Sequence, residues 1–287
     1  MYCIYTDTII SPTDSSEEHI IPLSLGGKNG FTIKVSKSIN SNLGAKIDGS
    51  IEKDFFINAT KRKNGYKGHS KKLAKYRVYA TIAETGEKVE IRYVGTENYL
   101  YNPRTKKKYT EEEKRQTVLD VNPPFDYTIR IRFVAKVLLG TGYFIYGNTF
   151  KENVDHENLR KIMNWEVLDE NNNDIEFPLG FMDEFSNVPE NSVPIHSVFK
   201  TVCAALACSC VIFVIGPNQI IGAVGIGGRY IGAVNFKANG EKFDFKEGPY
   251  DGIILAIQNN KIKRGSFHNF LKKIQSFKKK KGGSKND

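Results

Sequence analysis

Glutamate and histidine stand side by side near the amino terminus, as Glu18 and His19. A histidine can act as a neutral base near pH 7, and a carboxylate is an oxygen ligand for a hard cation such as Mg²⁺. Further along the chain, Asn40 offers an amide oxygen at the start of a predicted helix. A base for the attacking water and ligands for a divalent cation are what metal-assisted hydrolysis of a phosphodiester requires. These three residues therefore form a candidate site. Side chains alternate along a strand, so only one of Glu18 and His19 can point straight into it.

The elements that must position these residues are predicted by the hydrophobic pattern. EHIIP (18–22) indicates a short strand that ends at its proline, and FTIKVS (31–36) alternates as a second strand. Apolar residues then recur at helical spacing over 43–56, with Asn40 or Ser41 as the N-cap. The expected unit is strand, glycine-bearing loop, strand and helix.

The same residues carry a resemblance to a known family. EHIIP and LGG are followed by Asn40, Gly44 and the pair Ile47 and Asp48, in the order and spacing of a family motif. Over roughly residues 3–56 the chain resembles the HNH endonucleases. The resemblance implies a ββα-metal fold and metal-dependent cleavage of nucleic acid.

The resemblance also implies a role for each candidate residue. His19 would be the general base, Glu18 or a group beside it a metal ligand, and Asn40 the ligand at the helix start. Asp48 could line the same site as a further ligand. The implied cofactor is Mg²⁺, Mn²⁺ or another divalent cation. The asparagine at the centre of the family motif has no clear match, and Asn29 is only a weak candidate.

The family usually carries two C-x-x-C knuckles that bind a structural zinc. At the first knuckle the chain has Cys3 and Thr6, and at the second it has Ser36 and Ile39. One cysteine of the four is present, so no structural zinc is expected. Apolar packing must hold the unit together instead.

A structural role remains open for each candidate. His19 could be a turn residue at a strand end, Asn40 a helix cap only, and Asp48 an exposed helix carboxylate. The rival function is a nucleic-acid-binding protein with an inactive nuclease unit. Its distinguishing feature would be a failure of Glu18 and His19 to converge with Asn40 or Asp48.

The chain carries a formal net charge of +10, which suggests an anionic partner. Between Lys61 and Arg115 it has 16 Lys or Arg against 7 Glu. We expect phosphate contacts, to DNA with RNA not excluded, from the basic residues at the start of this segment. These are Lys61, Arg62, Lys63, Lys67, Lys71 and Lys72. A solvated basic face is the alternative for this segment.

The fold class expected for the whole chain is α+β, in four parts. Residues 1–58 are the ββα-metal unit, and 59–119 a basic segment whose alternation around Thr85-Gly86 indicates a β-hairpin, with Thr110 capping a helix. A mixed α+β domain of unknown role is expected over 120–260, with a buried helix at 129–147 and glycine-spotted strands at 208–236. Residues 261–287 are expected to form a basic amphipathic helix and a lysine-rich tail.

The remaining expectations concern location and assembly. No basic segment followed by an apolar one resembles a signal peptide, and the most apolar run, Val202 to Gly216, is too short to span a membrane. A cytoplasmic protein with no membrane partner is therefore expected, in a setting such as restriction or phage defence. Formation of a homo-oligomer is left open.

Overall fold

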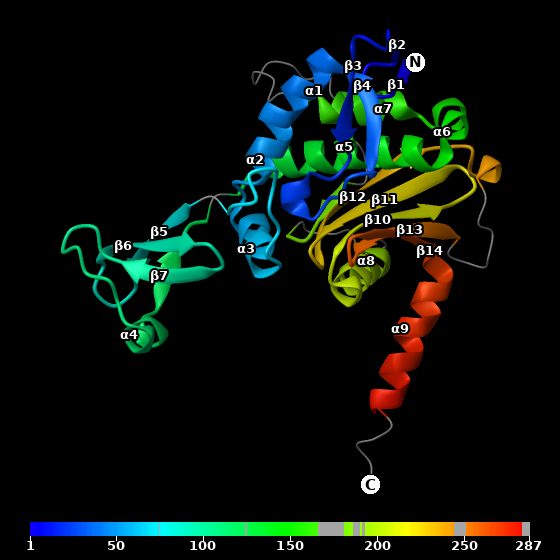
Figure 1. The fold of residues 1–287 in the computed structure, drawn as a ribbon. Coiled ribbons are helices and arrows are strands. Elements are labelled where there is room, and N and C mark those ends of the chain that lie inside the picture. The colour runs from blue at the N-terminus through cyan, green and yellow to red at the C-terminus, as the bar shows by residue number, and fades with distance from the viewer. Residues whose placement is uncertain are drawn as a thin grey trace.

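The computed structural model describes residues 1–73, 75–123, 125–165, 181–185, 190, 193–243 and 251–282. The predicted α+β class is confirmed, because over these described residues helices alternate with sheets whose strand pairs are antiparallel. Figure 1 shows the main body as layers, with helix α5 (Tyr127–Tyr146) between the N-terminal elements and the largest sheet. A small β module projects from one side of this body.

The largest sheet has six antiparallel strands in the order β14-β13-β10-β11-β12-β9. Their bounds are β9 Met182–Asp183, β10 Ser209–Ile215, β11 Gln219–Ile226, β12 Arg229–Lys237, β13 Gly252–Gln258 and β14 Lys261–Ser266. The strands predicted over 208–236 are thus confirmed. These sequences are apolar on both faces because helices cover both faces of the sheet.

Alternation along β10 shows how the two faces are divided. Val211 and Phe213 lie in the core that faces α5, whereas Cys210 and Ile212 lie in the core on the other side. Helix α8 (Val193–Leu206) and the start of α9 (Phe267–Gly282) cover that second face. The buried helix predicted over 129–147 is confirmed as α5.

Helix α5 lies very close to the sheet, at a glycine. A Cβ atom added to Gly222 of β11 would come within 2.5 Å of the Leu138 side chain. The absence of a side chain at this position therefore allows the close packing of helix on sheet. Helices α6 (Asn148–Asn153) and α7 (His156–Met163) follow α5 and complete this layer.

The N-terminal elements rest on the opposite side of α5. They are β1 Tyr2–Cys3, β2 Thr8–Ile9, β3 Ser15–His19, η1 Leu23–Leu25, β4 Thr32–Ser36, α1 Lys37–Leu43, a π-helical turn η2 Gly44–Asp48, α2 Gly49–Ile51 and α3 Phe55–Lys63. Strands β3 and β4 pair antiparallel, with His19 opposite Thr32. Their apolar residues share one continuous core with α5, so the core does not stop at the boundary predicted near residue 58.

Two local predictions in this region are wrong. The first strand ends at His19 rather than at Pro22, because Leu23–Leu25 turns into a short 3-10 helix that begins after the proline. The helix begins at Lys37 rather than at Asn40 or Ser41, so Asn40 lies inside α1 and is not its N-cap.

The projecting β module contains a four-stranded antiparallel sheet in the order β7-β6-β5-β8. Its strands are β5 Tyr76–Ile82, β6 Lys88–Val94, β7 Glu97–Tyr101 and β8 Leu119–Val121. A small core of its own includes Val89 and Leu100. Helix α4 (Glu111–Gln116) begins with a capping box in which Thr110 and Glu113 bond each other's backbone, as predicted for Thr110.

Among the described residues, no helix combines the length and the apolar character needed to cross a membrane. Helix α9 carries the predicted amphipathic pattern at its start, where Phe270 and Leu271 pack against the sheet. The end of the predicted lysine-rich tail, from residue 283, lies outside the described residues.

Candidate functional site

His19 lies at the carboxyl end of β3, half-buried, where the chain leaves the hairpin. Its Nε2 atom is 3.1 Å from Oδ1 of Asn29, which stands in the loop between β3 and β4. The His69 ring, from the loop after α3, meets the His19 ring edge-on with 5.8 Å between centroids. The structure therefore places two polar side chains against His19: Asn29, only a weak candidate from the sequence, and His69, which was not among the predicted site residues.

The contact with Asn29 decides what the imidazole of His19 can do. With Oδ1 accepting, Nε2 carries the proton, and Nδ1 keeps the lone pair that a base needs. A second group that orients the ring is the usual accompaniment of a histidine that acts as a base. The arrangement is thus chemically competent to take a proton from water. Asn29 is the residue that was a weak candidate for the central asparagine of the family motif.

Glu18 lies on the other side of the same strand and is buried. It forms an ion pair with Nζ of Lys136, which comes from the middle of α5 and is itself fully buried. Asp48 joins the same ammonium through both carboxylate oxygens, at 2.8 and 2.7 Å. The three residues form a buried ionic cluster, which we call the Lys136 cluster. A lysine in an apolar helix was the available sequence signal, since a buried lysine needs a partner.

The charges within the Lys136 cluster are unevenly balanced. Two carboxylates face one ammonium, and burial raises the pKa of Asp48 to about 6, with a further contribution from Glu18 against the opposing effect of Lys136. For Lys136, burial acts to lower the pKa, but Asp48 and Glu18 outweigh it and raise the pKa above its ordinary value. The ammonium therefore stays charged and compensates the carboxylates.

The predicted metal ligands do not fit a shared divalent cation in this arrangement. The ammonium of Lys136 already stands between Glu18 and Asp48, where such a cation would need to lie. In the described part of the chain, no three His, Cys, Asp or Glu side chains are grouped as a metal site would require. Glu18 and Asp48 are instead the ion-pair partners of Lys136.

Asn40 is separate from that cluster. Its side-chain nitrogen donates to Oγ of Ser16 at 2.9 Å and to the backbone carbonyl of Glu17 at 3.1 Å. These bonds connect the first turn of α1 to Ser16 and Glu17 of strand β3. They do not involve Glu18, the neighbouring residue that was predicted to share a metal with Asn40. Asn40 therefore fixes α1 against strand β3, the strand that carries His19.

Two of the six predicted phosphate-binding residues are buried within the protein. Lys61 is paired with Glu52, and only 7% of its surface is exposed. Arg62 donates from Nε to Asn58 at 2.7 Å and from Nη1 to the Gly95 carbonyl at 2.6 Å. Its guanidinium also faces the rings of Tyr76 and Tyr93, as cation–π partners. Arg62 thus attaches the β module to the main body, whereas Lys61 pairs within the N-terminal elements. The expectation that these two buried residues contact nucleic acid is wrong.

The other four basic residues are exposed. They are Lys63, Lys67, Lys71 and Lys72. Three of these belong to the loop that carries His69 next to His19, so their charges are close in the chain to the candidate base.

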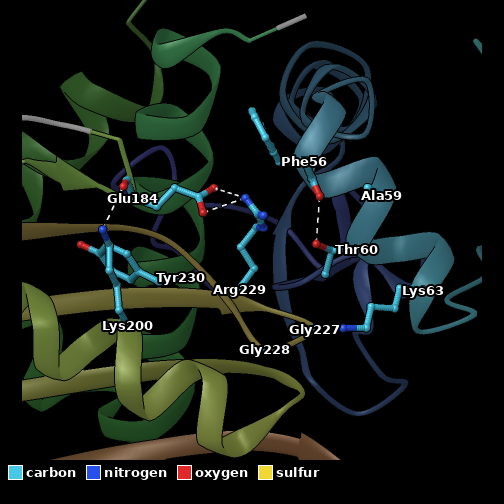
Figure 2. Close-up of a pocket in the computed structure, with 10 residues that line it drawn as sticks. All are labelled: Phe56, Ala59, Thr60, Lys63, Glu184, Lys200, Gly227, Gly228, Arg229 and Tyr230. Carbon is cyan, nitrogen blue, oxygen red and sulfur yellow. Dashed lines mark hydrogen bonds and ion pairs between the residues drawn. The ribbon is translucent and has the colours of Figure 1, made fainter. Parts of the chain in front are cut away.

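A pocket of about 550 Å³ lies between α3, the turn after β11 and the segment around Glu184 (Figure 2). Lys63, Lys200 and Arg229 bring positive charge to its wall, and Phe56 adds an aromatic face. None of the residues that line this pocket, apart from Lys63, was among the predicted site residues. The only local signal was the glycine pair followed by an arginine, because the other walls come from distant segments.

Comparison with known proteins finds no family model, no curated protein and no solved structure that matches this chain.

Proposed function

We propose that the protein hydrolyses phosphodiester bonds in nucleic acid, with His19 as the general base. The observation that carries this proposal is the bond between His19 and Oδ1 of Asn29 at a half-exposed strand end. It leaves one imidazole nitrogen free to take a proton from water. The pairing of β3 with β4, followed directly by α1, is also the order of elements expected for an HNH unit.

Substrate binding in this proposal depends on the loop after α3. Lys67, Lys71 and Lys72 are exposed and flank His69, which contacts the ring of His19. Lysines bind phosphate as point charges and release counterions from the nucleic acid, without reading the base sequence. The loop would therefore hold the backbone of either DNA or RNA next to the base.

Binding can be tested separately from cleavage. Replacing Lys67, Lys71 and Lys72 with glutamine should lower the slope of log affinity against log salt by roughly 0.9 for each phosphate of duplex DNA that is no longer neutralised. The matched control replaces Lys88, Lys106 and Lys108, exposed residues of the β module, in the same way. Equal slopes for both triple variants would mean that the loop is a solvated basic face that does not contact phosphate.

The decisive experiment is incubation of the purified protein with supercoiled plasmid and with single-stranded RNA. Each reaction is run with Mg²⁺, with Mn²⁺ and with EDTA, so that any need for a divalent cation is measured directly. The variant is His19→Ala, and His268→Ala on α9 is the matched control. Cleavage by the protein and by the control, but not by His19→Ala, supports the proposal. Equal cleavage by all three would show that His19 is a turn residue.

A second function is favoured by a specific observation, the Lys136 cluster. Among the described residues the partners of His19 are Asn29 and His69, whereas Glu18 meets Asp48 through Lys136. His19, though not Glu18, thus shows the failure to converge that is expected of a nucleic-acid-binding protein whose nuclease unit is inactive. Salt-dependent binding of DNA or RNA, without cleavage under any of the three metal conditions, would select this second function.

A further inference from the structure

We propose that the pocket between α3 and the turn joining β11 to β12 binds a small phosphate ester of nucleotide size. The pocket measures about 550 Å³, within the roughly 300–1,000 Å³ typical of small-molecule sites. It is not formed by any residue of the His19 site. Figure 2 shows the side chains of Lys63, Arg229 and Lys200 arranged around it, from three different elements.

The wall of the pocket carries excess positive charge. Its charged residues are Lys63, Lys200, Arg229 and one carboxylate, Glu184. Glu184 accepts two bonds from Nη1 of Arg229, at 2.8 and 2.7 Å, and one from Nη1 of Arg130 at 2.9 Å. Its negative charge is therefore already compensated by arginines.

Arg130 does not leave a charge of its own in the pocket. It is fully buried and holds Asp54 through two bonds of 2.8 and 2.9 Å, in addition to its bond with Glu184. Asp54 in turn caps α3, whose backbone amides at Phe56 and Ile57 it accepts at 3.0 Å. This chain of contacts fixes the wall that carries Glu184 and Arg229, so the pocket is preformed.

The lysines have no carboxylate partner among the described residues. Lys200 donates only to the backbone carbonyl of Glu184, at 2.9 Å, and it is exposed. Lys63 is also exposed, at the last turn of α3, and Figure 2 shows it extending toward Gly227. Two ammonium groups and a guanidinium held in place by a carboxylate suit an anion with several oxygens, as a phosphate group is.

The floor of the pocket is formed by glycines that keep it open. Gly227 and Gly228 have φ values of 56° and 88°, in the left-handed region. A Cβ at Gly227 would lie 2.7 Å from atoms of both Thr60 and Asn64, and one at Gly228 would lie 3.0 Å from Ala207. The turn therefore passes close under α3 without side chains. Phe56 also lines the pocket, and its ring centroid lies 4.9 Å from the Arg229 guanidinium, which it helps to hold in place.

The phosphate could come from a free nucleotide or from the 5′ end of a nucleic-acid strand. Both present the same chemistry to the two lysines and Arg229. Isothermal titration of the full chain with ATP, with AMP and with 5′-phosphorylated dinucleotide separates them. Adenosine and a 5′-hydroxyl dinucleotide serve as probes that lack the terminal phosphate.

We expect the phosphorylated probes to bind and the unphosphorylated ones to bind at least about tenfold more weakly, the equivalent of one charged hydrogen bond. In the double variant Lys63→Gln with Lys200→Gln, affinity for ATP should fall by about a hundredfold. The matched control is Lys242→Gln, an exposed lysine that does not line the pocket. Thermal unfolding of each variant checks that the fold is retained.

The outcomes are separable. ATP binding with the expected loss identifies a free-nucleotide site, and binding of the phosphorylated dinucleotide alone identifies a strand-end site. No binding of any probe, equal binding of adenosine and ATP, or unchanged ATP affinity in the double variant would overturn the proposal. His19→Ala should bind ATP as the unmodified protein does, so failure of the nuclease proposal does not affect this test.

Discussion

His19 and Glu18 are neighbours in the sequence, yet they belong to two regions with different properties. His19 is half-exposed, and its side-chain partners in the described part of the chain are Asn29 and His69, both from loops. Glu18 faces the opposite side of β3 and is buried against Lys136, in the interior of the protein. The comparison shows how a single strand can carry an accessible histidine on one face and a buried, ion-paired carboxylate on the other. Alternation of side chains along the strand is sufficient to separate the two roles.

The largest effect is expected from the buried side. Lys136→Met leaves two carboxylates in the core without a counter-charge, which should lower the free energy of unfolding by about 3–5 kcal/mol. Urea denaturation measures the loss. The control is Lys34→Met, because Lys34 pairs with Glu17 on the exposed face of the same hairpin at 3.6 Å, where a pair contributes about 0–1 kcal/mol.

A companion variant keeps this prediction testable when the single variant does not fold. Lys136→Met combined with Glu18→Gln and Asp48→Asn removes all three charges and should recover most of the lost stability. A single variant as stable as the Lys34→Met control would mean that the Lys136 cluster is not a structural element.

On the accessible side, His19→Ala should reduce cleavage by about 10²-fold or more, the effect of removing a general base. The free energy of unfolding should change little, since the histidine is half-exposed and its described side-chain partners, Asn29 and His69, lie in loops. Initial cleavage rates and urea denaturation on the same preparations measure the two quantities. A large loss of stability with little loss of rate would reverse the assignment of roles to the two faces.

Asn29→Ala should have a smaller effect, a loss of about tenfold in cleavage rate, because the base stays in place and only its orientation is released. Binding of DNA should be unchanged. Asn98→Ala, at an exposed position in the β module, is the control. If Asn29→Ala cleaves as fast as the control, the bond to His19 does not orient the base.

The last effect concerns pH. The folded protein raises the pKa of Asp48 to about 6 through burial, above its ordinary value of 3.8. Between these values the folded state holds a proton that the unfolded state has released, so the free energy of unfolding falls as the pH rises. The stabilisation that comes from protonated Asp48 is complete below about pH 4 and is lost as the pH rises through 6. The slope is at most about 1.4 kcal/mol per pH unit.

This pH dependence can be isolated by substitution. The free energy of unfolding is measured by urea at pH 4.5, 5.5 and 6.5. In Asp48→Asn the side chain cannot titrate. Its free energy of unfolding should therefore fall less between pH 4.5 and 6.5 than that of the unmodified protein, by up to about 1.4 kcal/mol for each pH unit. In Asp120→Asn, an exposed control, the profile should match that of the unmodified protein. Identical profiles in all three proteins would contradict the raised pKa of Asp48.

Periodicity along the chain was enough to predict several elements. The apolar stretch at 129–147 became helix α5, and the β-branched, glycine-spotted stretch at 208–236 became three strands of the main sheet. Thr110 caps its helix as predicted. Each of these depends on the preferences of neighbouring residues, which are written locally in the sequence.

The partners of the charged residues were decided only by tertiary structure. Asp48 and Lys136 are 88 positions apart, and Arg62 reaches the Gly95 carbonyl 33 positions away. A lysine in a basic run and a carboxylate in a metal motif look available to a ligand until folding supplies an internal counter-charge. Packing brings that counter-charge from a distant segment, so the local sequence pattern does not predict it. For the same reason the pocket at Arg229, with walls from separate elements, emerges only in the folded chain.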